Sequence, residues 1–546
     1  MKILYSWLKD YVDMDAQPSE LVEKLFGAGL EVEETIYLCK DIENVVVGEI
    51  TALEKYEGTH LLICKLDCGK HGRDIVILTG ADNVFVGAKV PAALVGAKLP
   101  NGISIAPRKM QDMMSYGMLC SGGELGVDDN WINGAEVNGI LILPPDTETG
   151  KDIKEVLELD DWLFDVSITA NRPDCQSVLG IAREVAAFLN KPLKEPDYFY
   201  ECDGTTNPDI SVTVEAKDVC PRYLGHYIYD VKHFESPQWM KRRLSACGFA
   251  AIDAIVDVTN YVLLEIGQPM HAFDLSTLDG SSIVVRRAKE GEELITLNEK
   301  SNLLNPSNLL ICDKSKPVGL AGIMGGLNSE IVPETKAILL ESAKFMRDSV
   351  RKTARALGLH TDAAARYEKG VDEYGVECGM ARALNLVQSL GIAQISSSHF
   401  DESAGASTNE RVITVQTAKV NGVLGIEVPE EKIISILKSL GFGVAQNGGS
   451  LEITVPRWRE DIDGYQDTAE EVIREYGYSH LTPTFLDSAK VTDGGLDTAQ
   501  NKELFCKKFL CAQGYYEVQT LAMYSRRELS LLMLPENAAE HKAIEL

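Results

Sequence analysis

Short apolar segments separated by turn residues fill the sequence between about Val45 and Pro145. Four of them have the length and composition of β-strands, at residues 45–50, 61–66, 75–78 and 90–94. Strands this short, interrupted by glycine at close intervals, suit a small barrel. The pattern therefore predicts a β-barrel domain over residues 39–150.

The chain is too long for one hydrophobic core. Its 546 residues, 45% hydrophobic and 25% charged, are typical of a globular protein with about three to five domains. It contains no apolar run long enough to cross a bilayer and no signal peptide. Its twelve cysteines form no Cys-x-x-Cys pair, which disfavours a zinc site or a disulfide framework. These features predict a cytoplasmic protein with reduced thiols and no membrane partner.

Changes in composition and hydrophobic periodicity along the sequence predict further domains or segments at residues 1–38, 151–200, 209–400, 405–485 and 490–546. The first is a helical cap with a helix from Pro18, and the second is a connecting segment that packs with this cap. In the connecting segment, Asn171 and Arg172 are expected in a turn at the surface. The last part has a helix around Leu504 and a strand at 514–518, then stops at Leu546 without completing a domain, so the chain is expected to be truncated.

The net charge of −29 disfavours a general nucleic-acid binder, because phosphate contacts need Lys and Arg. Any RNA contact must come from local basic patches, of which the sequence offers two. One is the short run 241–243. The other is a series at spacings of three and four, which places its members on one helix face: Lys344, Arg347, Arg351 and Arg355. Most such series are simply solvated faces.

A polar stretch near the middle of the chain carries a candidate reactive side chain. Residues 255–274 run from an apolar opening through a polar turn to a Gly-Gln-Pro corner. Because Pro269 fixes its own φ and favours extended geometry before it, His271 is expected on a rigid loop rather than in a helix. A histidine held in this way can act as an acid, a base or a hydrogen-bond donor. The alternative is a structural histidine satisfied by a backbone carbonyl.

Two further features of the 209–400 unit point to a site. Residues 319–326 contain four glycines, which allow the backbone to approach another strand or a ligand closely. They do not form a nucleotide phosphate loop, since the following Lys and helix are missing. The apolar strand 338–344 carries Glu341, and a carboxylate on a buried strand is costly unless it has a partner.

A second set of carboxylates consists of Asp461, Asp467, Glu470 and Glu471. A helix beginning near Asp467 would make this residue an N-cap, with Glu470 at N3 in a capping box. Hard carboxylate oxygens are also suitable ligands for Mg²⁺. The sequence leaves both interpretations open.

The barrel region resembles a known module, the OB-fold tRNA-binding domain of some synthetases and free tRNA-binding factors. The resemblance rests on residues 80–84, 95–100, 115–121 and 124–126. Such domains bind by shape and backbone contact more than by base sequence. The sequence departs from the family at 56–60 and at 110–114, where an Arg-Gly is replaced by Met110-Gln-Asp-Met-Met114. We therefore expect weak tRNA affinity here.

In their order, the parts together resemble the β subunit of bacterial phenylalanyl-tRNA synthetase over essentially the whole length. The resemblance implies a multidomain α+β fold: an OB-fold β-barrel, a large α/β editing domain of B3/B4 type at 209–400, a winged, DNA-binding-like B5 domain at 405–485, and the start of a class II synthetase-like α/β domain at 490–546. Full-length members continue beyond residue 546 with the rest of that domain and an anticodon-binding domain.

The resemblance also implies a function. With an α subunit in an (αβ)₂ heterotetramer, the family attaches phenylalanine to tRNA(Phe) using ATP at the α-subunit site. The β subunit would contribute tRNA binding, α-subunit contacts and hydrolytic editing of tyrosine esterified to tRNA(Phe). A pocket shaped for phenylalanine cannot strongly reject a side chain that merely adds a hydroxyl, so a second, hydrolytic site has to sort the two.

The family's functional residues map onto specific positions of this chain. Glu341 would accept the tyrosyl hydroxyl, and His271 would orient the ester end or the attacking water. Gly325, Thr361 and Ala363 match pocket walls, although the sequence Thr361-Asp-Ala-Ala departs mildly from the family's usual Thr-Glu-Ala-Ser. The family also places Mg²⁺ ligands, shared with the α subunit, at Asp461, Asp467, Glu470 and Glu471.

Two functions of other classes compete with this one. The chain could be a non-catalytic tRNA-binding scaffold, in which the 209–400 unit is only structural. It could also be a general nucleic-acid binder acting through 405–485, which the acidity of that region disfavours. Hydrolysis of the tyrosyl ester that requires His271 or Glu341 would separate the editing function from these two alternatives.

Overall fold

The structure is a computed structural model that describes residues 1–135, 139–403, 410–484, 494–535, 537–542 and 544. It contains two compact units, Met1–Leu481 and Thr482–Leu546. The boundaries expected at 405, 485 and 490, and the end of the chain at Leu546, lie outside the described residues. Within the described residues, no helix is both long and apolar enough to cross a membrane.

The N-terminal segment and the 151–200 segment share one sheet. Strand β10 (Trp162–Ser167) lies between β1 (Lys2–Leu4) and β2 (Glu31–Tyr37), antiparallel to both. The helices of this layer are α1 (Tyr5–Tyr11), α2 (Pro18–Gly27) and α4 (Val178–Leu189), whereas the short α3 (Ile153–Val156) packs in the core of the barrel described next. The two segments therefore pack together as predicted, but the cap is not purely helical, because it supplies two of the three strands.

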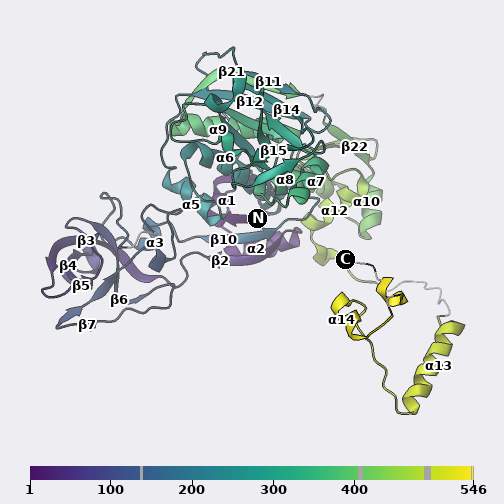
Figure 1. Ribbon diagram of the computed structural model, residues 1–546, viewed down its shortest axis with the longest axis horizontal. Coiled ribbons are helices and arrows are strands. Elements are labelled where there is room, and N and C mark those ends of the chain that lie inside the picture. The colour runs from purple at the N-terminus through teal and green to yellow at the C-terminus, as the bar shows by residue number, and fades with distance from the viewer. Residues whose placement is uncertain (136–138, 404–409, 485–493, 536, 543, 545–546) are drawn as a thin grey trace. The chain divides into compact units, whose positions relative to one another are not determined.

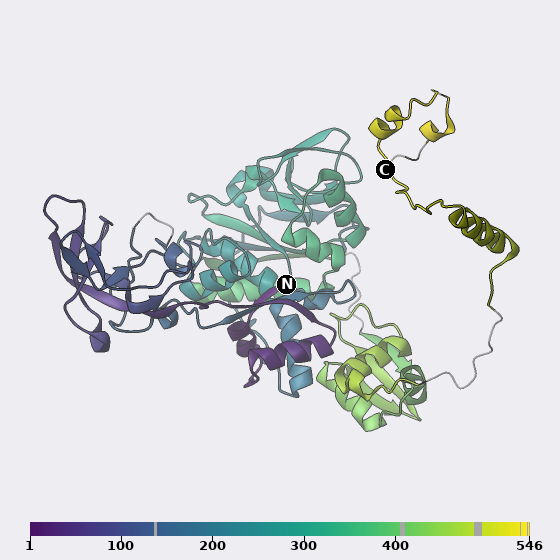
Figure 2. The same ribbon diagram turned by 90° about the horizontal axis from the view of Figure 1, so that it is seen from below.

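A barrel of five strands follows the cap and forms a separate lobe of the first unit (Figures 1 and 2). The strand order is β5-β4-β3-β6-β9, with bounds Ile75–Thr79, Leu62–Asp67, Glu43–Lys55, Lys89–Lys98 and Gly117–Leu119. The Tyr116 N–H donates to the Val76 carbonyl at 2.9 Å, which links the last strand back to the first in space. A hairpin of β7 (Arg108–Met110) and β8 (Met113–Ser115) is appended. All four strands predicted from sequence are present.

The large domain contains two sheets. One has the order β11-β14-β17-β18-β19, with bounds Ser211–Val214, Ser282–Arg287, Leu309–Cys312, Pro317–Leu320 and Met324–Gly325. The other has the order β13-β20-β12-β21, with bounds Met270–Asp274, Ala337–Lys344, Arg222–Tyr229 and Gln394–Ser403. The remaining elements are a hairpin of β15 (Glu292–Ile295) and β16 (Ser301–Leu304), and the helices α5 (Gln238–Ala246), α6 (Ala254–Glu265), α7 (Arg347–Leu357), α8 (Asp362–Lys369) and α9 (Glu373–Leu390).

The four-stranded sheet is buried on both faces, which its alternating side chains show. Ala272 and Leu340 belong to the core that includes α6 and α9, whereas Phe273 and Leu339 belong to the core shared with the five-stranded sheet. Successive residues of a strand point to opposite faces, so one apolar strand can contribute to both cores. This explains why β20 is a continuous apolar run up to Glu341.

Four expectations, one for the 151–200 segment and three for the large domain, are wrong. Residues 255–265 lie in helix α6 rather than in a turn, and His271 lies on strand β13 rather than on a loop. Arg172 is buried, with 5% of its surface exposed, because Asp174 and Glu184 bind its guanidinium. In the 241–243 run, Lys241 and Arg242 are buried and Arg243 pairs with Asp10 while lying over two tryptophan rings, so this run is no open basic patch.

The third part of the first unit is a three-stranded sheet with helices. Strand β24 (Ser450–Val455) lies between β22 (Arg411–Val415) and β23 (Gly443–Asn447), and the helices are α10 (Thr417–Leu424), α11 (Glu430–Ser439) and α12 (Tyr465–Tyr476). Helix α12 begins two residues earlier than expected. Asp467 is at N3, where its carboxylate accepts the N–H groups of Asp463 and Gly464 at 2.9 Å, so the predicted N-cap role with Glu470 at N3 is wrong.

The second unit, Thr482–Leu546, contains α13 (Thr498–Ala512), which confirms the helix predicted around Leu504, and the short α14 (Arg526–Leu531). The strand predicted at 514–518 is absent from the described residues. Tyr516 and Val518 are 94% and 77% exposed, and a strand needs a neighbour to accept its hydrogen bonds.

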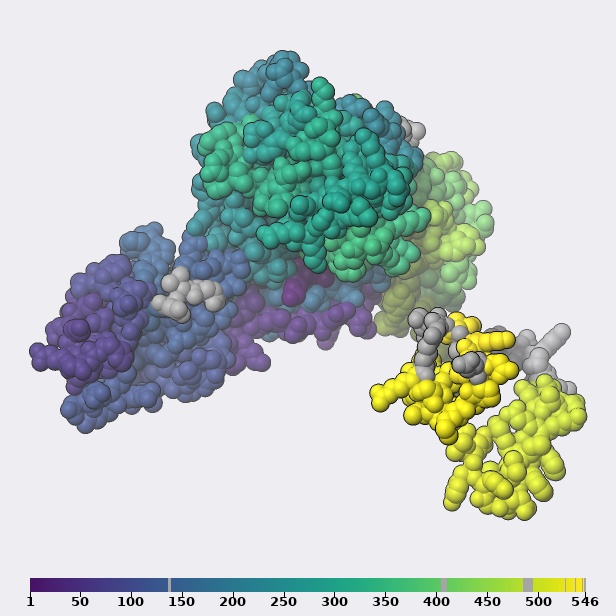
Figure 3. Space-filling model, in the orientation of Figure 1, coloured from purple at the N-terminus to yellow at the C-terminus, as the bar shows by residue number. Residues whose placement is uncertain are grey.

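A buried network of charges joins the third part to the N-terminal layer, where the two surfaces meet (Figure 3). Glu184 on α4 accepts from Arg172 at 2.6 Å and pairs with Arg474 on α12. Glu471 pairs with the same Arg474 and with Arg459, the latter at 2.6 Å. Burial by itself would raise the pKa of Glu184, but Arg474 and Arg172 outweigh it and lower the pKa to about 2. The carboxylate is therefore held ionised by two arginines from different parts of the chain.

We expect Glu184→Gln to destabilise this junction by about 3–5 kcal/mol, because it leaves buried arginines with too little negative charge. The measurement is urea unfolding of the full chain. Glu43→Gln is the matched control, since the Glu43–Lys98 pair is more than half exposed on both sides and should contribute less than about 1 kcal/mol. Equal effects of the two substitutions would contradict the prediction.

The same network predicts an acid dependence. The folded pKa of Glu184 is about 2, below the ordinary value of 4.5. Its stabilising charge is thus fully present above about pH 4.5 and is lost as the pH falls towards 2. The free energy of unfolding of the Glu184→Gln variant should therefore fall less steeply below pH 4.5 than that of the parent chain. Urea unfolding of both proteins at a series of acid pH values measures this difference.

Candidate functional site

A pocket lies between the ends of the two sheets of the large domain and helix α8. It contains about 390 Å³ of empty space, including its mouth. Its walls come from β13, β18, β19, β20 and α8, and they are apolar apart from a few groups. Of the five pocket residues predicted from sequence, four line it: His271, Gly325, Glu341 and Ala363.

His271 and Glu341 are brought together by strand register. They are direct partners in the antiparallel pair β13–β20, so their side chains lie on the same face of the sheet. That face is the one that carries Phe273 and Leu339 towards the five-stranded sheet. Two residues that are 70 positions apart in sequence therefore border one small space.

Glu341 is a buried carboxyl group, with 5% of its surface exposed. Burial raises its pKa to about 7, against a smaller lowering effect of the Tyr223 hydroxyl, which donates to Oε2 at 2.7 Å. No arginine or lysine pairs with Glu341 in the described part of the chain. A carboxylate without a cation is a strong acceptor for one more hydroxyl donor.

His271 is a neutral imidazole at pH 7, because burial lowers its pKa to about 4. Its ring meets the Phe273 ring edge-on at 4.6 Å between centroids. Among the described residues, its buried Nε2 atom has no hydrogen-bond partner. The Nε2 atom is therefore not satisfied by a backbone carbonyl, which the alternative interpretation of this residue would require.

Gly325 gives the histidine ring its space. A Cβ atom added at this position would lie 2.4 Å from Cε1 and 2.5 Å from Nε2 of His271. Gly319, its partner on β18, has only ordinary contacts, since an added Cβ there would meet no atom closer than 3.8 Å. The close approach expected from the glycine-rich stretch thus occurs at Gly322, Gly325 and Gly326 but not at Gly319, and at Gly325 the close neighbour is the histidine ring.

Thr361 supports the pocket without lining it. Its hydroxyl accepts the Ala364 N–H at 3.1 Å as the N-cap of α8 and donates to the Ile323 carbonyl at 2.9 Å. It thereby fastens α8, with Ala363, to the glycine-rich turn.

Sequence reasoning missed two tyrosines, Tyr223 and Tyr367, whose side chains reach the site from β12 and α8. An aromatic residue in a strand or helix pattern does not by itself show whether it belongs to the core or to a site.

The four carboxylates predicted as Mg²⁺ ligands do not form a cation site in this chain. Arg459 binds both Asp461, at 2.9 Å, and Glu471, so two of the four are already neutralised. Asp467 caps α12, and Glu470 is exposed. The arrangement of these residues does not fit a metal held by this chain alone, and a site shared with a second subunit stays a prediction.

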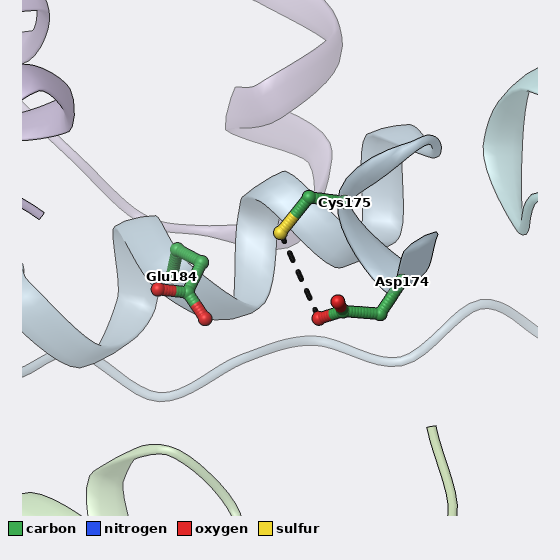
Figure 4. Close-up of side chains that lie close together, drawn as sticks. All are labelled: Asp174, Cys175 and Glu184. Carbon is green, nitrogen blue, oxygen red and sulfur yellow. Dashed lines mark hydrogen bonds between the residues drawn. The ribbon is translucent and has the colours of Figure 1, made fainter. Parts of the chain in front are cut away.

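One other group of potential ligands is close enough to hold a metal among the described residues: Asp174, Cys175 and Glu184 (Figure 4). The Arg172 guanidinium contacts all three, with Nη2 at 2.8 Å from Asp174, 3.1 Å from the Cys175 sulfur and 2.6 Å from Glu184. Burial also raises the pKa of the Cys175 thiol, which disfavours the thiolate. The cation of this cluster is the arginine itself.

Comparison with known proteins agrees with this architecture. Three family models match: a putative tRNA binding domain over residues 45–152, a B3/4 domain over 219–391 and a tRNA synthetase B5 domain over 413–478. The phenylalanine–tRNA ligase beta subunit of Syntrophus aciditrophicus is 40% identical over 552 residues, covering 100% of this chain and 67% of that protein. The chain belongs to the family of phenylalanine–tRNA ligase beta subunits. The beta subunit of Carboxydothermus hydrogenoformans is 39% identical with the same coverage.

Membership of this family confirms the predicted fold class, with tRNA-binding, B3/4 and B5 domains. The chain spans about two thirds of the length of these relatives. In this beta-subunit chain, the pocket with His271 and Glu341 lies within the B3/4 match, and the Arg459–Glu471 pair lies within the B5 match.

We expect Gly325→Ala to displace the His271 ring, because the new methyl group would overlap it. The His271 ring resonances in an NMR spectrum of histidine-labelled protein should shift, and the free energy of unfolding should fall by about 1–3 kcal/mol. Gly319→Ala, on the neighbouring strand, should leave both unchanged. Similar spectra for the two variants would show that Gly325 does not fix the ring.

Proposed function

We propose that the B3/4 pocket is a hydrolytic editing site, which releases tyrosine from tRNA(Phe) to which it has been wrongly esterified. The observation that carries the proposal is Glu341, a buried carboxyl group in a pocket with mostly apolar walls, with no cation paired to it in the described ranges of the chain. A tyrosyl ring would fill the apolar part, and its hydroxyl would donate to the carboxylate. A phenylalanyl ring would leave the carboxylate without that hydrogen bond. A site built to bind a hydroxyl can strongly disfavour a ligand that lacks it, so the pocket would select the tyrosyl over the phenylalanyl ester.

His271 supplies the polar group near the ester. As a neutral imidazole it can accept a proton from water or donate one, depending on its tautomer. In the proposed reaction a water oxygen bonds to the ester carbonyl carbon, the bond to the tRNA ribose oxygen breaks, and the water proton ends on that oxygen. His271 would orient the water or the ester end, and its buried Nε2 has no competing partner in the described part of the chain.

Membership of the family supports a proposal for the rest of the assembly. We propose that the barrel contributes weak tRNA binding, and that an α subunit pairs with this chain in an (αβ)₂ tetramer and carries the ATP-dependent attachment of phenylalanine. Mg²⁺ and ATP belong to that partner site in this proposal. The four carboxylates near α12 take no step in the chemistry assigned to this chain.

The decisive experiment is release of tyrosine from tyrosyl-tRNA(Phe) by the full chain, with and without an added α subunit. We expect Glu341→Ala to lower the rate by about tenfold or more for the tyrosyl ester, since it removes a charged hydrogen-bond acceptor. His271→Ala should lower it further, in line with the role of an acid–base or orienting group. No release in either condition would contradict the proposal and favour a non-catalytic tRNA-binding scaffold.

The pH dependence of editing tests the role of Glu341 separately. Its pKa of about 7 lies above the ordinary 4.5, so the carboxylate forms as the pH rises through 7. The ratio of hydrolysis rates for tyrosyl and phenylalanyl esters should therefore increase between about pH 6 and 8, after subtraction of spontaneous hydrolysis. Glu341→Gln should remove this increase, whereas His271, with a pKa of about 4, should not contribute to it.

A further inference from the structure

A second cavity lies close to the proposed editing pocket but is separate from it. It contains about 1210 Å³ of empty space, including its mouth, where α4, the start of α9 and the loop after β24 meet. Gln268 lines this cavity, and the next residue, Pro269, lines the editing pocket. Nothing in the mechanism proposed above uses the cavity.

Two buried polar atoms at this cavity have no hydrogen-bond partner among the residues that the structure describes: Oε1 of Gln268 and Nε of Arg183. Gln268 is 1% exposed. Its Nε2 donates to the carbonyls of Pro269 and Ala343 at 2.9 and 3.0 Å, which fixes the orientation of the amide. Its Oε1 therefore faces Gly375, where an added Cβ would lie 3.8 Å away. Unpaired buried donors and acceptors are rare in proteins, and a ligand could satisfy both.

The other lining side chains restrict the chemistry of such a ligand. The Arg183 guanidinium lies over the Trp458 ring at 4.0 Å, and Tyr198 and Tyr374 add two further aromatic rings. Among the described residues that line the cavity, Arg183 is the single basic one, against four acidic ones: Asp174, Glu195, Asp372 and Glu460. This balance disfavours a polyanion such as a nucleotide. It favours a molecule with one acidic group for the arginine, an ammonium group and a flat apolar part.

We propose that this cavity binds a free α-amino acid with an aromatic side chain. Its carboxylate would pair with Arg183, its ammonium group would donate to Gln268 Oε1 on the side of Asp372, and its ring would lie among the aromatic side chains. The site is independent of the editing function, because it shares no lining residue with the editing pocket.

The experiment is a titration of the full chain with L-phenylalanine, followed by tryptophan fluorescence. Trp458 lies in the cavity wall and is one of five tryptophans, so Trp458→Phe shows which part of the signal comes from the site. We expect a saturable change with L-phenylalanine. 3-Phenylpropionate, which lacks the ammonium group, and phenethylamine, which lacks the carboxylate, should bind at least about tenfold more weakly.

Two variants locate the binding site. Arg183→Met should weaken binding at least about tenfold, since it keeps an apolar contact to Trp458 but removes the charge. Gly375→Leu should abolish binding by filling the space before Gln268, and it should fold, because no atom lies within 3.4 Å of an added Cβ at Gly375. Gly422→Leu is its control, a helical glycine with open space around it.

Other results would overturn the proposal. These are the absence of a saturable response, an unchanged response in both Arg183→Met and Gly375→Leu, or a response lost in Glu341→Gln, which alters only the editing pocket. Tighter binding of AMP than of phenylalanine would assign the cavity to a nucleotide instead. Because editing is measured by tyrosine release and this site by fluorescence, either proposal can fail without the other.

Discussion

Strand β20 has no face and no edge open to water. Leu340 packs with the helices on one side, Leu339 packs with the five-stranded sheet on the other, and β13 and β12 pair with its two edges. A carboxyl group on such a strand loses most of its hydration, so its pKa rises and the chain must provide a partner. Tyr223 provides one hydrogen bond, and no cation among the residues that the structure describes pairs with Glu341, so the carboxylate can accept another donor. The chemistry of the pocket follows from this burial.

The histidine opposite Glu341 is subject to the same constraint. Register places His271 directly across from the carboxyl group, and burial then keeps the imidazole neutral. The ring fits only because β19 carries glycine at 325. Two strands and a glycine thus determine the orientation of the ring before any substrate binds, which is the kind of preorganisation that hydrolytic sites need.

The sequence predicted the barrel strands, the strand with Glu341 and four residues that line the pocket, because local patterning and family resemblance both pointed to them. The prediction from sequence failed where contacts between distant segments determine the burial and the pairing of a charged residue. Arg172 was expected at the surface, but its partner Glu184 is twelve residues away and Arg474, which shares that glutamate, is 290 residues from Glu184. Periodicity cannot show such pairings. Nor could it show that Lys344 ends a strand and pairs with Glu460, rather than continuing the exposed face of α7 that Arg351 and Arg355 occupy.

The loop after β24 connects the B5 part to helix α4 of the N-terminal layer and to the large domain. In three consecutive residues, Trp458 stacks on Arg183, Arg459 binds Glu471, and Glu460 pairs with Lys344 at the end of β20. Glu341 lies three residues before that lysine on the same strand. Gln268 is held to β20 as well, through the Ala343 carbonyl. The strand that carries the proposed specificity residue is therefore anchored at its C-terminal end by two contacts, the Lys344–Glu460 pair and the hydrogen bond from Gln268, and both contacts border the second cavity.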